Sequence, residues 1–189
     1  MMSKKYVNPT KVVTGPKTRW SYVNVWTPKA VSEGAVPKYS VSLIIPKSDT
    51  QTIEKINNAI KAAYEDGRAK LQGNGKIVPP LEAIHTPLRD GDIFRKDDEA
   101  YKDSYFLNAN STSAPGIVDI DCNAILDYSE VYSGVYGRAS ISFYAYNNNG
   151  AKGIAVSLNN LQKTADGEPL GSKSTPQSDF GGADDGFLD

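Results

Sequence analysis

Cysteine and histidine are almost absent from this chain of 189 residues, which holds one of each, Cys122 and His85. A single cysteine excludes a disulfide within the chain, and this pair supplies too few ligands for a structural zinc site. Long apolar runs are also missing, because the stretch around Leu43 stops at Pro46, well short of the roughly 20 residues that a membrane-spanning helix needs. The N-terminal residues lack the apolar segment of a signal peptide. We therefore expect a cytosolic protein without a membrane anchor.

Sequence motifs of phosphate-transferring and dinucleotide-dependent enzymes are absent as well. No glycine-rich loop of the P-loop or Rossmann type occurs in the chain. The carboxylates of Asp90, Asp92 and Asp97 could hold Mg²⁺ in a nuclease. They lie, however, in residues 73–100, which are rich in proline, glycine and charge, and this composition favours a solvated loop. We predict no catalysis, no metal and no cofactor, and a metal-dependent nuclease remains an alternative.

Lysine and arginine are missing from the last sixteen residues, STPQSDFGGADDGFLD. The chain has 21 basic and 22 acidic residues, and subtracting the four tail aspartates leaves 21 against 18, a net charge of +3 for residues 1–173. Such a tail buries too little apolar surface to offset its ordering entropy, so we predict that residues 173–189 are disordered. The tail either aids solubility or acts as a docking peptide or polyanion mimic. The residues assigned to docking are Asp179, Asp184, Asp185, Phe187, Leu188 and Asp189.

Hydrophobic periodicity predicts a mainly β fold with one helix. Apolar and polar residues alternate over 18–26, 38–45, 103–110, 135–146 and 152–161, which predicts five strands. Between the second and third of these, isoleucines at helical spacing predict a helix from about Thr50 to about Leu71, with Ser48 and Gln51 as a capping box. Asn147 to Gly150 predict the tight turn between the last two strands.

This order of elements predicts a five-stranded barrel of the oligonucleotide-binding (OB) type, with the helix inserted between its second and third strands. A β-sandwich is the alternative. The predicted domain spans residues 11–172. A flexible lead, residues 1–10, precedes it, and the disordered acidic tail, residues 173–189, follows it.

Aromatic and basic side chains share one face of the predicted strands. A ring that stacks on a nucleobase contributes about 1–3 kcal/mol, and basic groups contact phosphates without reading sequence. Between the rings of the fourth strand, Ser140 and Ser142 are short enough for a ligand to lie close to the sheet. For the two tryptophans, burial in the core is an alternative of equal weight to DNA stacking. The residues predicted to bind single-stranded DNA are Arg19, Trp20, Tyr22, Trp26, Arg138, Tyr144, Tyr146 and Lys152.

Several segments of the chain resemble a phage family that was long catalogued as a domain of unknown function and is regarded as single-stranded DNA-binding proteins. The resemblance is carried by RWSYVNVW, PKYSVSLIIPKSD, LRDGD, DDEAY, YFLNANS and the run from Ser129 to Lys163. It covers about residues 11–180 and implies an OB-type barrel, an inserted helix and an acidic C-terminal tail with an aromatic near its end. The bacterial version of such tails ends on Pro-Phe, whereas this chain ends on Phe187-Leu188-Asp189, which leaves the docking partner open.

The resemblance implies a phage protein that binds single-stranded DNA without sequence preference in replication, recombination or repair. It would act in the cytoplasm of the infected bacterial host, and its tail would recruit replication or recombination proteins and compete with DNA. No membrane and no small-molecule substrate are expected. Besides the nuclease at Asp90, Asp92 and Asp97, the alternative is an adaptor whose tyrosine-rich face binds another protein.

Overall fold

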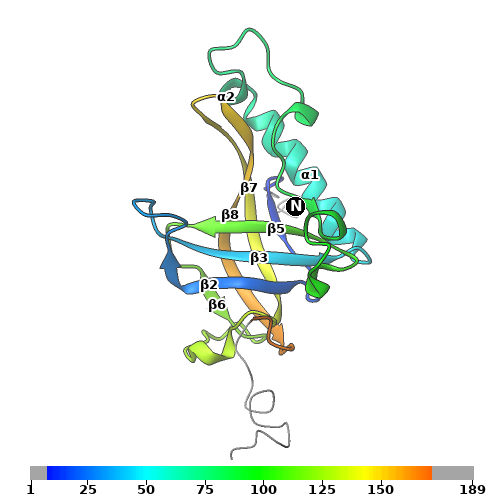
Figure 1. The fold of residues 1–189 in the computed structure, drawn as a ribbon, viewed down its shortest axis with the longest axis vertical. Coiled ribbons are helices and arrows are strands. Elements are labelled where there is room, and N and C mark those ends of the chain that lie inside the picture. Colours follow the sequence, from blue (N-terminus) through cyan, green and yellow to red (C-terminus); the bar gives the residue numbers. More distant parts are fainter. Residues whose placement is uncertain (1–7, 172–189) are drawn as a thin grey trace, which may run out of the picture.

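Five strands pair into a closed ring in the computed structural model, which describes residues 8–171 (Figure 1). Around this ring, β7 pairs with β2, β2 with β3, β3 with β5, β5 with β8, and β8 again with β7. The five predicted strands are confirmed as β2 (Arg19–Lys29), β3 (Lys38–Pro46), β5 (Ser104–Ser111), β7 (Tyr136–Asn148) and β8 (Ala151–Ala165). Three short strands add to the sheet: β1 (Lys11–Val13), β4 (Arg89–Asp90) and β6 (Gly116–Val118).

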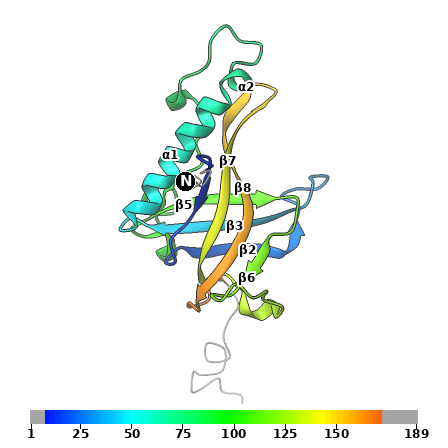
Figure 2. The ribbon, with the colours of Figure 1, turned by 180° about the vertical axis from the view of Figure 1, so that it is seen from behind.

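The ring is flattened into two layers that cross steeply. Strands β2, β3 and β5 run across one side, and the long β7–β8 hairpin runs across the other (Figures 1 and 2). The two layers meet through single residue pairs, Asn110 with Ser157 and Arg19 with Tyr136. Alternating apolar side chains from both layers fill the space between them, as the period-two pattern requires. The core includes Val25, Val41, Leu43, Leu107, Ile141, Phe143, Ile154 and Leu158.

The inserted helix forms where it was predicted. It consists of α1 (Thr50–Asp66) and α2 (Arg68–Gln72), separated at Gly67. A Cβ atom at Gly67 would collide with Ala145 of β7, so a glycine at this break lets the helix pack closely on the sheet. The predicted cap was wrong: Asp49, not Ser48, precedes the helix, and its carboxylate accepts hydrogen bonds from the backbone amide and hydroxyl of Thr52.

The alternation predicted for the first strand is broken by a bulge. Tyr22 has a φ of 48°, and the register with β3 shifts between Ser21 and Asn24. As a result, Trp20 does not share the face of Tyr22 but is fully buried, and its indole N–H donates to the carbonyl oxygen of Gly137 at 3.1 Å. The assignment of Trp20 to DNA stacking was therefore wrong, because the core covers both faces of its ring.

The long connection between α2 and β5 is ordered and carries short helical turns. These are η1 (Leu81–Ala83), α3 (Gly91–Phe94) and η2 (Glu99–Tyr101), while η3 (Tyr128–Glu130) follows β6. Asn149 and Gly150 both have positive φ, which confirms the predicted hairpin turn. Within residues 8–171, no helix has the length and apolar character that a membrane span demands. The predictions for most of the N-terminal lead and for the tail fall outside the described residues.

Candidate functional site

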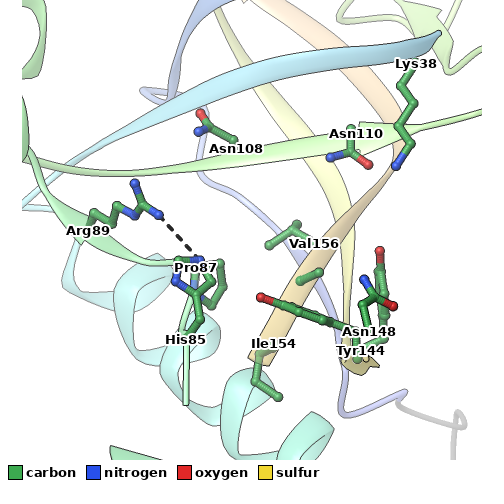
Figure 3. A pocket seen from close by; sticks show the side chains of 12 residues that line it. Lys38, His85, Pro87, Arg89, Asn108, Asn110, Tyr144, Asn148, Ile154 and Val156 are labelled. Carbon is green, nitrogen blue, oxygen red and sulfur yellow. Dashed lines mark hydrogen bonds between the residues drawn. The ribbon is translucent and has the colours of Figure 1, made fainter. Parts of the chain in front are cut away.

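A groove of about 510 Å³ opens between β5, the outer end of the β7–β8 hairpin and the segment that leads into β4 (Figure 3). Its walls combine aromatic rings, amides and cationic side chains. The residues that line it are Lys38, His85, Pro87, Arg89, Asn108, Asn110, Tyr144, Tyr146, Asn148, Ile154, Ala155 and Val156.

The two tyrosines reach the groove because β7 keeps a strict alternation. Phe143 and Ala145 point into the core, so the ring of Tyr144 between them points outward and is 45% exposed. Ala155 stands opposite Tyr144 on β8, and its small side chain leaves room beside the ring. Tyr146 lines the same groove one alternate position further along. The prediction that Tyr144 is exposed is confirmed, whereas Tyr146 is half-buried.

Strand β5 supplies the floor through Asn108 and Asn110, which alternate with the buried Leu107 and Ala109. Within residues 8–171, neither of these two side-chain amides makes a hydrogen bond, and the ammonium of Lys38 makes no ion pair. Each amide offers both donors and an acceptor, and the lysine offers a positive charge. These three groups are therefore free to contact a polar, anionic ligand.

The third wall of the groove is the segment from His85 to Arg89, which leads into β4. Backbone hydrogen bonds of His85 hold this wall against β8. Its amide donates to the oxygen of Lys152 at 3.3 Å, and its own oxygen accepts from Ile154 at 2.8 Å. Burial, and secondarily the charge of Arg89, lowers the pKa of His85, so the imidazole is neutral at pH 7. Its Nε2 lies 3.4 Å from a guanidinium nitrogen of Arg89 (Figure 3). Arg89 therefore carries the positive charge of this wall.

Two of the three acidic residues considered for a nuclease site, Asp90 and Asp92, instead anchor this wall to the end of β3. The ammonium of Lys47 lies 3.0 Å from a carboxylate oxygen of Asp90 and 2.8 Å from one of Asp92. Hydrogen bonds to Asp92 and then Asp90 raise the pKa of Lys47, and the bond from Lys47 lowers the pKa of Asp92. Asp92 also accepts from the backbone amide of Asp103 at 3.0 Å.

A lysine thus pairs with two of the three carboxylates on which the nuclease alternative depends. Asp97 is exposed and takes no part in this ion pair. Among residues 8–171, no group of three or more histidine, cysteine or acidic side chains could hold a metal ion. The geometry therefore gives the nuclease alternative no support.

The remaining predicted DNA contacts are spread over other parts of the surface. Arg19 donates to the backbone oxygens of Gly134 at 3.0 Å and Glu168 at 2.6 Å, which fastens the chain after β8. Arg138 is exposed in a separate depression beside Thr14, whose oxygen accepts from it at 3.2 Å. Lys152 is the second residue of β8, next to the hairpin turn, and its ammonium donates to the backbone oxygen of Gln72 at 3.5 Å.

On β2, Tyr22 is 59% exposed, and Trp26 is partly buried and stacked on Tyr128. The structure therefore brings only Tyr144 and Tyr146 of the predicted set together in the groove.

Sequence reasoning missed the cationic and amide groups of the groove. Asn108 and Asn110 could have been found, because they are the polar residues at alternate positions of a predicted strand. Lys38, at the start of the second predicted strand, is likewise one of the polar residues that alternate with apolar ones. Arg89 and His85 had no such signal, since no period marks the loop that carries them.

Three comparisons relate the chain to known proteins. The family model described as "Enterobacter phage Enc34, ssDNA-binding protein" matches residues 10–188. Protein p50 of Acyrthosiphon pisum secondary endosymbiont phage 1 is 33% identical over 156 residues, which cover 79% of this chain and 81% of p50.

Solved structures show the same architecture. The single-stranded DNA-binding protein of bacteriophage Enc34, in complex with ssDNA, superposes with a TM-score of 0.72 at 22% identity, covering 89% of this chain and 97% of that one. The single-stranded DNA-binding protein gp2.5 of bacteriophage T7 gives a TM-score of 0.59 at 14% identity, covering 90% and 93%. At these identities the likeness establishes the fold, which is OB-like and mainly β, as predicted.

Proposed function

The chain belongs to the family of the Enterobacter phage Enc34 ssDNA-binding protein, and from that premise we propose that it binds single-stranded DNA without sequence preference. The binding site is the groove between β5 and the β7–β8 hairpin. The observation that carries the proposal is that the exposed ring of Tyr144 lines the same groove as the ammonium of Lys38 and the guanidinium of Arg89. Every base has a π-face that a ring can stack on, and cations attract every phosphate alike.

The open form of the groove supports single-stranded over duplex DNA. A stacking ring such as Tyr144 needs an unpaired base whose face is accessible, which a duplex does not offer. The side-chain amides of Asn108 and Asn110 line the groove and can donate to or accept from any base edge, so they add contacts while tolerating different sequences.

Titration of the full-length protein with fluorescently labelled oligothymidine over a salt series tests the proposal. We expect binding that weakens steadily as salt rises, since each phosphate contact releases a counterion. A labelled duplex of equal length is the control and should bind more weakly. If micromolar protein gives no salt-sensitive binding to oligothymidine, the proposed function is wrong.

Within this proposal, the acidic tail competes with DNA and recruits proteins. Residues 174–189 contain four aspartates and no lysine or arginine, so they mimic a polyanion. Phe187 and Leu188 supply apolar anchors for a protein partner. The partners are replication or recombination proteins, and the setting is the cytoplasm of an infected bacterium.

Deletion of residues 174–189 should strengthen binding to oligothymidine, most visibly at low salt. The reason is that a competing anion has been removed, and its attraction to the basic body is screened as the Debye length shortens. Fluorescence titration of both proteins across a salt series measures the effect. A variant with the four tail aspartates changed to asparagine should behave like the deletion, and equal affinity of all three proteins would exclude competition.

A further inference from the structure

A second aromatic pair, Trp26 of β2 and Tyr128 of η3, lies outside the set of residues that line the groove. The rings of Trp26 and Tyr128 stack with centroids 4.4 Å apart and an interplanar angle of 16°. Trp26 is partly buried, whereas Tyr128 is 64% exposed. One face of the tyrosine ring is therefore backed by Trp26, while much of the remaining ring is open to solvent.

The ring of Tyr128 is held in place by its own turn. Asp127 caps η3 and accepts from both the amide of Ser129, at 2.9 Å, and its hydroxyl, at 2.6 Å. These bonds lower the pKa of Asp127, so the cap is ionised and intact at neutral pH. A ring that is fixed before a ligand arrives loses little entropy on binding.

Short polar side chains connect the groove with this pair. Asn110, at the floor of the groove, pairs with Ser40 of β3, and Ser40 pairs with Asn24 of β2. Directly opposed residues of antiparallel strands share a face, and the amide of Asn24 lies 3.5 Å from the hydroxyl of Ser40. Strands lie about 4.8 Å apart, so this row spans roughly 10 Å from β5 to β2. These three side chains lie on the same face of the sheet as the floor of the groove.

A positive charge lies along the same route. Lys38 lines the groove from the start of β3, and its Cα partner on β2 is Lys29, three residues beyond Trp26. The ammonium of Lys38 is thus suited to a phosphate between the groove and the aromatic pair. The carboxylate of Asp127 next to Tyr128 disfavours a phosphate there, so this end of the route suits a nucleobase rather than a phosphate.

We propose that single-stranded DNA leaves the groove over Asn110, Ser40 and Asn24 and stacks a further base on Tyr128. This inference rests on the proposed function and assigns the DNA a path across β5, β3 and β2. Trp26 acts as the support of the stacking ring rather than as the surface that the base contacts.

Replacement of Tyr128 with alanine should weaken binding of long oligothymidine by about 5- to 100-fold, the loss expected for one stacked base. Oligothymidine of about four nucleotides, which fills only the groove, should bind the variant and the wild type equally. Tyr128→Phe should keep the affinity, because the π-face remains. Leu126→Ala is the matched control, since Leu126 is 84% exposed on the same loop and should not contribute.

Tryptophan emission gives an independent readout. Trp20 is fully buried, so a change in emission on DNA binding reports on Trp26, and it should occur with long but not with short oligothymidine. If Tyr128→Ala binds long oligothymidine as the wild type does, and emission stays constant, the path is overturned while the groove proposal stands. If the wild type binds no oligothymidine at all, both proposals fail.

Discussion

Replacing Trp20 with alanine is expected to lower the free energy of unfolding by about 3–5 kcal/mol, as for other large core side chains. The indole is fully buried, and its N–H donates to the Gly137 carbonyl, which would lose this partner. A Cβ at Gly137 would collide with the Trp20 ring, so β7 approaches it too closely for a bulkier residue at this position. The resulting cavity could not be filled by local adjustment alone. Urea unfolding followed by circular dichroism measures the change.

Tyr22→Ala is the control for this experiment. Tyr22 lies two residues away on the same strand but is 59% exposed, so its removal should change stability by less than about 1 kcal/mol. A similar loss in both variants would contradict the assignment of Trp20 to the core and of Tyr22 to the surface.

The double substitution Lys38→Gln and Arg89→Gln is expected to weaken oligothymidine binding by roughly 50- to 100-fold at about 0.05 M salt. Each cation that contacts a phosphate of single-stranded DNA contributes about 0.7 to the slope of log K against log salt, so the slope should fall by about 1.4. The affinities of the wild type and the double variant should therefore converge as salt rises. Fluorescence anisotropy over a salt series gives both quantities.

Lys76→Gln with Lys96→Gln removes the same charge from exposed positions that do not line the groove. This control should keep most of the affinity and of the salt slope. If both double variants lose affinity equally, binding depends on overall charge and not on the groove.

The strand pattern of the sequence was enough to predict the fold, because alternate residues of each strand must face the core. The five ring strands form where the alternation predicts them, although β2 carries a bulge, and the helix forms where the spacing of its isoleucines predicts it. The pattern could not reveal the bulge at Tyr22. A bulge adds one residue to the strand, so the side chains before it point to the opposite faces from those that a regular alternation predicts. That one residue explains why Trp20 and Val25, five positions apart, are both buried.

Only part of the candidate site could be predicted from the sequence, because local alternation orients only those residues that lie on regular strands. Tyr144 and Tyr146 lie on a regular strand, so alternation gave their orientation. Arg89 reaches the groove because β4 pairs with β5 and Lys47 ties Asp90 and Asp92 to the end of β3. Contacts between segments this far apart in the chain depend on the folded arrangement, and no local pattern encodes them.

Ultraviolet cross-linking of oligothymidine to the full-length protein, followed by mass mapping of the modified peptide, tests the groove most directly. We predict adducts on the hairpin segment that carries Tyr144 and Tyr146, and their loss when excess unlabelled oligothymidine competes. Adducts confined to the depression around Arg138, or to α1, with none on this hairpin, would contradict it.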